Sequence, residues 1–97
     1  MTDKYILDGK TPVPCGDLIA WATWLGKTNR HVGNAEKDGV RASTVFLGLD
    51  HSWGDGPPRL FETMIFGGEH DGYQERCSTW EEAEAMHTKA CALAGIA

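Results

Sequence analysis

The sequence has 97 residues, of which 41% are hydrophobic and 24% are charged, and its formal net charge is −5 at pH 7. This length is near that of one domain and leaves no room for a second hydrophobic core, so we expect residues 1–97 to form a single domain. The nine lysines and arginines are scattered, which argues against direct nucleic-acid binding, because that binding needs clustered cations to neutralise phosphates.

Cysteine usage and the absence of long apolar stretches bear on location. Cys15, Cys77 and Cys91 lie far apart and form no CxxC pair, so the sequence predicts neither a disulfide framework nor a zinc finger. No stretch has the length and apolar character of a signal peptide or a membrane span. We therefore expect a cytoplasmic protein with no membrane partner.

The N-terminal part of the chain alternates between extended and helical patterns. A strand is predicted at residues 4–7, followed by a second extended piece that two prolines stiffen. Asp17 is a suitable N-cap for an amphipathic helix that follows it. Beyond this helix, turn-forming residues predict an exposed loop over residues 33–39.

The C-terminal part predicts strands and one long helix. β-branched and aromatic residues indicate strands at residues 41–49 and 59–66, and a short third strand at residues 73–77. Ser78 or Thr79 is a suitable cap for the final helix, whose first turn is acidic.

Together these elements predict an α+β fold: a small, largely antiparallel three- or four-stranded sheet with two helices packed on it. Trp80, in the first turn of the final helix, is expected to belong to the core. On the strand at residues 41–49, period-two alternation leads us to expect the following residues on the core face: Ser43, Val45, Leu47 and Leu49.

The connection between the two longer strands, DHSWGDGPPR, is longer than an ordinary hairpin loop. Trp53 lies in its middle and is flanked by polar and charged residues. Tryptophan and arginine contribute much of the energy of protein interfaces, so the loop predicts a protein-binding patch. The alternative is that Trp53 folds back as a lid on the core. The residues of the predicted patch are Asp50, His51, Trp53, Asp55 and Arg59.

A second hypothesis is a small hydrolase-type enzyme. Glu62 lies in an otherwise apolar strand, where a carboxylate can serve as a general base, with His51 or His87 as further candidates. The alternative for Glu62 is exposure to solvent or an ion pair with Arg41 or Arg59. The histidines show no HxH or HExxH spacing, so we predict no metal ion and no cofactor.

Four segments, YILDGKTPVP, STVFLGLDH, GPPRLFETMIFGG and STWEEAEAMH, together resemble a family of small uncharacterised accessory proteins encoded by phages and prophages. The resemblance runs from about Tyr5 to His87. Cys77 stands where the family usually has tyrosine, and Met86 stands where it usually has glycine, which puts in doubt any role that needs those residues.

The resemblance implies a protein of the host bacterial cytoplasm with an accessory role. It suggests that the chain binds a host or defence protein and modulates or inhibits it, as an anti-CRISPR protein does. The alternatives are the small enzyme described above and a minor phage structural or assembly protein. The sequence leaves the identity of the partner and the oligomeric state open.

Overall fold

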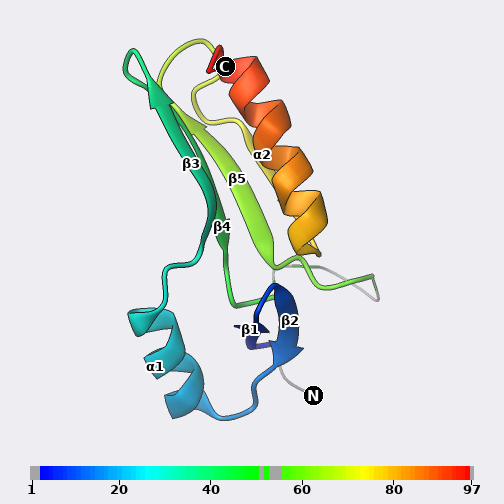
Figure 1. Cartoon of the computed structure of the whole chain (residues 1–97). Helices are drawn as coiled ribbons and strands as arrows, with labels where there is room; N and C mark the ends of the chain where they lie inside the picture. Colours follow the sequence, from blue (N-terminus) through cyan, green and yellow to red (C-terminus); the bar gives the residue numbers. More distant parts are fainter. Residues whose placement is uncertain (1–2, 51, 53–55, 97) are drawn as a thin grey trace.

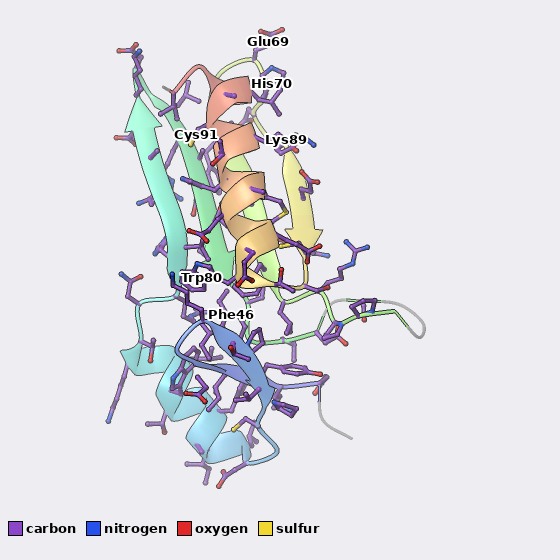
Figure 2. The ribbon with its side chains drawn as sticks, turned by 45° about the vertical axis from the view of Figure 1, so that its right-hand side comes forward. Phe46, Glu69, His70, Trp80, Lys89 and Cys91 are labelled. Atoms are coloured by element: carbon purple, nitrogen blue, oxygen red, sulfur yellow. The ribbon has the colours of Figure 1, made fainter. Side chains whose placement is uncertain are left out.

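The computed structural model describes residues 3–50, 52 and 56–96. Its main body is an antiparallel sheet in which the strands are neighbours in chain order, with one helix lying along one face (Figures 1 and 2). The elements of this layer are β3 (His31–Lys37), β4 (Val40–Phe46), β5 (Phe61–Phe66), β6 (Gln74–Cys77) and α2 (Trp80–Ala94). The expected α+β class, with a four-stranded antiparallel sheet and two helices packed on it, is confirmed.

An N-terminal unit lies at one end of this sheet (Figure 1). It consists of a two-stranded hairpin, β1 (Tyr5–Asp8) and β2 (Thr11–Pro14), followed by α1 (Leu18–Lys27). The sequence predicted both extended pieces and the helix. No residue of α1 is fully buried, so this helix covers little of the core.

β3 occupies most of the segment for which the sequence predicts an exposed loop, residues 33–39. That prediction is wrong because the glycine here meets a packing requirement. Gly33 faces α2, and a Cβ at this position would lie 2.5 Å from atoms of the His87 ring. The turn itself is confined to Asp38 and Gly39, whose φ angles of 53° and 81° are those that a tight two-residue hairpin needs.

The core face of β4 is also the opposite of the one expected. Leu47 and Leu49, on which the expectation depended, lie beyond the end of the strand at Phe46. Ser43 and Val45 alternate with the core residues and therefore face away from α2. The side chains of Ala42, Thr44 and Phe46 are each 0% exposed, and Ser43, on the other face of β4, is 8% exposed.

Both helices begin at residues that the sequence indicated as caps. The Asp17 carboxylate accepts hydrogen bonds from two backbone N–H groups in the first turn of α1. Thr79 and Glu82 form a reciprocal capping box at the start of α2. Within the described part of the chain, neither helix has the length and apolar character needed to cross a membrane.

The N-terminal unit is joined to the sheet through the segment that follows β4. The carbonyl oxygen of Gly48 accepts hydrogen bonds from the Tyr5 backbone N–H at 2.8 Å and from the Trp21 indole N–H at 2.9 Å. The Trp24 ring meets the Phe46 ring edge-on, with 5.7 Å between centroids. Because Gly48 has a φ of 76°, another residue here would strain this junction.

Candidate functional site

The loop that the sequence predicts as a binding patch is closed at its base by one carboxylate. Asp50 Oδ1 accepts hydrogen bonds from the backbone N–H groups of Ser52 at 2.8 Å and Arg59 at 3.0 Å. The structure therefore brings Asp50 and Arg59, two of the five predicted residues, together. The other three lie outside the described residues: His51, Trp53 and Asp55.

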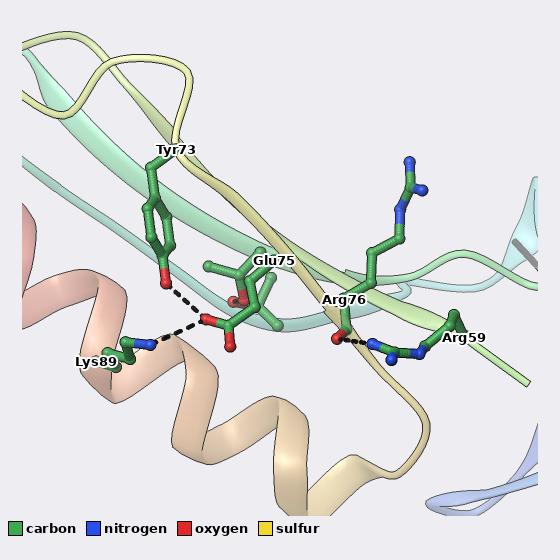
Figure 3. Close-up of polar contacts among 7 residues, drawn as sticks. Arg59, Tyr73, Glu75, Arg76 and Lys89 are labelled. Atoms are coloured by element: carbon green, nitrogen blue, oxygen red, sulfur yellow. Dashed lines mark hydrogen bonds and ion pairs between the residues drawn. The ribbon is translucent and has the colours of Figure 1, made fainter. Parts of the chain in front are cut away.

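The Arg59 side chain extends from the loop to the edge of the sheet. Its Nη1 donates a hydrogen bond to the backbone carbonyl oxygen of Arg76 at 3.0 Å (Figure 3). A guanidinium group has five N–H donors, so this bond leaves donors for a further ligand. In the parts of the chain that the structure describes, no carboxylate forms an ion pair with Arg59.

A groove of about 470 Å³ opens beside Arg59, between β6 and α2. Because α2 packs mainly over β4 and β5, it leaves the inner face of the edge strand β6 partly uncovered. The lining combines apolar and charged side chains, a composition typical of a protein-binding surface. Its residues are Pro57, Arg59, Glu75, Arg76, Cys77, Ser78, Glu82, Ala85, Met86 and Lys89.

Two residues of this lining, Glu75 and Lys89, form a cluster with the neighbouring Tyr73. The Tyr73 hydroxyl donates a hydrogen bond to Glu75 Oε2 at 2.5 Å, and Lys89 Nζ lies 3.4 Å from the same oxygen (Figure 3). The hydrogen bond from Tyr73 is the main cause that lowers the pKa of the Glu75 carboxyl, and it also raises the pKa of Tyr73. Glu75 is therefore ionised at neutral pH, and Lys89 pairs with it.

Glu62, a candidate base, takes part in a polar cluster on the sheet face away from α2. Its Oε2 accepts hydrogen bonds from Arg76 Nε at 2.8 Å and from the Gln74 side-chain amide at 2.5 Å. The sequence suggested Arg41 or Arg59 as ion-pair partners, but the partner is Arg76. This pair also balances the positive charge of Arg76 on the sheet face away from the groove.

His87, the other candidate that the structure describes, lies on the face of α2 that packs on the sheet, where it takes part in a series of side-chain contacts. Its Nδ1 lies 2.8 Å from Thr44 Oγ1, which is 2.6 Å from Thr63 Oγ1, and its Nε2 lies 3.6 Å from Cys91 Sγ. Thr63 and Glu62 are consecutive in β5 and point to opposite faces. Glu62 and His87 therefore do not share a site.

The order of groups Cys91, His87 and Thr44 matches that of a nucleophile, a base and an orienting residue. Its electrostatics differ, because desolvation by burial raises the pKa of the Cys91 thiol and lowers the pKa of His87. Both changes favour the neutral thiol and the neutral imidazole over a reactive thiolate and imidazolium pair. We interpret this chain of contacts as a hydrogen-bonded part of the core.

Within residues 3–50, 52 and 56–96, no group of three or more His, Cys, Asp or Glu side chains is placed to hold a metal ion.

Comparisons of the chain with protein-family models, with curated proteins and with solved structures give no match. The relationship to the phage-encoded family therefore stays a prediction from the sequence motifs.

Proposed function

We propose that this chain is an accessory protein of a phage or related mobile element that binds a host or defence protein and modulates or inhibits it. The observation that carries the proposal is the groove at which the Arg59 end of the predicted binding loop meets β6 and α2. An anti-CRISPR-like inhibitor is the specific form of this role that the sequence resemblance implies.

The chemistry of the groove is that of an interface. Met86, Ala85 and Cys77 supply apolar surface, and Arg59 supplies a guanidinium group whose charge no described carboxylate balances. Arginine beside apolar surface that a partner can desolvate is typical of the few residues that dominate binding energy. A binding role for Arg59 agrees with its place at the base of the loop.

The enzyme alternative receives less support from the geometry. Its candidates Glu62 and His87 lie on opposite faces of the sheet, and Glu62 is engaged by Arg76. The neutral contact between Cys91 and His87 lacks the thiolate that cysteine-dependent acyl transfer requires.

The proposal is tested by affinity capture from a lysate of the host bacterium, followed by quantitative mass spectrometry and a binding measurement on the purified partner. Replacing Trp53 or Arg59 by Ala is expected to weaken binding by about 2 kcal/mol or more, because such side chains contribute disproportionately to interfaces. Melting temperatures of both variants should change little.

The matched control is Lys37→Ala, which removes a cation from β3 at the opposite edge of the sheet. It should bind the partner as the wild type does. Unchanged affinity of both the Trp53→Ala and Arg59→Ala variants would refute this contact surface. A lowered melting temperature of these variants with unchanged affinity for the partner would instead assign the loop a structural role.

A further inference from the structure

The outer edge of β6 presents backbone groups that β5 does not use. The Ile65 backbone N–H donates a hydrogen bond to the Tyr73 carbonyl, so this carbonyl points toward β5. In an antiparallel ladder this direction alternates, and the backbone groups of Gln74 and Arg76 therefore point outward. The bond from the Arg59 side chain to the Arg76 carbonyl agrees with this assignment.

The charges beside this edge are balanced except at one point. Of the cations in the groove lining, Lys89 pairs with Glu75, and Arg76 pairs with Glu62. Glu82 is held in the capping box of α2. Arg59 is left without a carboxylate partner within the described residues, so the groove offers a place for one negative charge next to unused strand edge.

We propose that the partner contributes an extended segment that pairs with β6 as a further strand of the sheet, beside α2, with an aspartate or glutamate side chain of that segment bound to Arg59. This inference rests on the proposed function and specifies the kind of partner. The Gln74 backbone N–H and carbonyl supply the pairing groups. Arg59 keeps its bond to the Arg76 carbonyl, ends the pairing there, and binds the carboxylate through its remaining donors.

A second copy of this chain fits the edge less well than a foreign segment. Pairing of β6 with itself about Glu75 places two carboxylates opposite each other, and pairing about Arg76 places two guanidinium groups opposite each other. Like charges directly opposite in a ladder are destabilising. Self-pairing also brings together the Arg59 side chains of both copies, which adds to the repulsion.

The test is selection of a random heptapeptide library, displayed on phage with peptides flanked on both sides, against immobilised full-length protein. The wild type is expected to enrich peptides in which one acidic residue lies at an end of a run of β-branched residues. Lys37→Gln, at the opposite edge of the sheet, should enrich the same peptides. The selected peptide is then synthesised with a fluorescent label and its Kd is measured by fluorescence polarisation.

Two variants separate the two parts of the contact. Arg59→Gln keeps a side-chain hydrogen-bond donor, on a shorter side chain, but removes the charge, and it should raise the Kd at least about tenfold and abolish the preference for acidic peptides. Gln74→Pro removes an outward N–H that β5 does not use, and it should also raise the Kd at least about tenfold. Circular dichroism and a melting curve show whether each variant is folded.

Failure to enrich any peptide class, or equal Kd values for the wild type and folded Arg59→Gln, would overturn the inference, even if Gln74→Pro does not fold. A partner captured from lysate that binds Gln74→Pro and Arg59→Gln as tightly as the wild type would leave the proposed binding function in place and refute strand pairing. Absence of both a captured partner and a selected peptide would refute both.

Discussion

His87 lies in a closely packed position that favours its neutral form. Its ring lies against Gly33, where a Cβ would meet ring atoms at 2.5 Å, and its nitrogens face Thr44 and Cys91. Desolvation lowers the pKa of His87 below its usual value of 6.5. The sequence suggested His87 as a catalytic residue of an enzyme. Its contacts are with residues of β3, β4 and α2, so we interpret it as a residue that stabilises the fold.

This lowered pKa predicts a pH dependence of stability. At pH values just below about 6.5, His87 is protonated in the unfolded chain but still neutral in the folded chain. Protonation of His87 therefore favours unfolding. The contribution of His87 is present above pH 6.5 and is lost as the pH falls toward the folded-state pKa. We expect the free energy of unfolding, measured in urea, to decrease from pH 7 to pH 5 in the wild type.

His87→Asn, which keeps a polar group near Thr44, should make this decrease smaller, and the exposed His31→Asn should leave it as in the wild type. The range ends above 4.5, the ordinary pKa of glutamate, so the loss of stability from the lowered pKa of Glu75 falls mainly at more acidic pH. A His87→Asn variant with the same slope as the wild type would show that His87 is not the group responsible.

At the scale of elements, the start of α2 is fixed by a cap and an aromatic contact. The Trp80 ring meets the Phe61 ring edge-on with 6.2 Å between centroids, next to the capping box. The Trp80 side chain is only partly exposed, and its indole N–H is buried without a hydrogen-bond partner among the described residues. Ring packing therefore holds this residue, together with the Lys10 ammonium group, which lies 5.6 Å from the centroid of the Trp80 ring.

Trp80→Ala is expected to lower the free energy of unfolding by about 3 kcal/mol, because it removes a large aromatic contact with the core. Trp80→Phe should cost much less, since it keeps an aromatic ring and removes the unpaired N–H. Urea unfolding monitored by circular dichroism distinguishes the two variants. Equal stability of Trp80→Ala and the wild type would mean that α2 docks through its other apolar residues.

Elements whose signals are local could be predicted, and those that depend on a partner element could not. The caps Asp17 and Thr79 act within one turn of their helices, so their residue types were sufficient. The sequence did not predict β3, because Gly33 and Asn34 are residue types that usually form turns. In the structure, Gly33 instead makes room for the ring of His87, which is distant in the sequence. The same dependence on α2 decided which face of β4 is buried.

The candidate site shows the same limit. Arg59 was predicted as a residue of the binding patch because it belongs to the charged loop that connects two strands. The groove arises only when β6 and α2 lie side by side, so the sequence did not indicate the part of Glu75 or Lys89 in it. A weak signal was present in the alternation of Tyr73 and Glu75 on one face of the short strand.

At the scale of the whole molecule, the protein consists of a sheet layer and a less buried N-terminal unit. The contacts that attach the unit include the hydrogen bonds to the Gly48 carbonyl, the bridge between Lys4 and Leu49, and the contact of Trp24 with Phe46. No residue of α1 is fully buried, whereas the centres of β4 and β5 are. Opening of the unit should therefore require less free energy than opening of the sheet.

Hydrogen exchange followed by mass spectrometry should show amides of α1 exchanging on the order of tenfold or more faster than those at the centres of β4 and β5. Trp21→Phe removes one of the two hydrogen bonds to the Gly48 carbonyl. It should speed exchange in α1 and leave β5 unchanged. Equal acceleration in both regions would show that the chain opens as one cooperative unit.

The chain order of the sheet has a consequence for how the protein folds. β3, β4, β5 and β6 pair with their neighbours in sequence, and α2 follows directly, so most of the sheet layer needs only short-range loop closure. The N-terminal unit is synthesised before its attachment points, Phe46 and Gly48, leave the ribosome. Its docking must therefore wait for the middle of the chain, and we expect the last-made helix and the sheet to assemble rapidly while the first-made helix is among the last to settle.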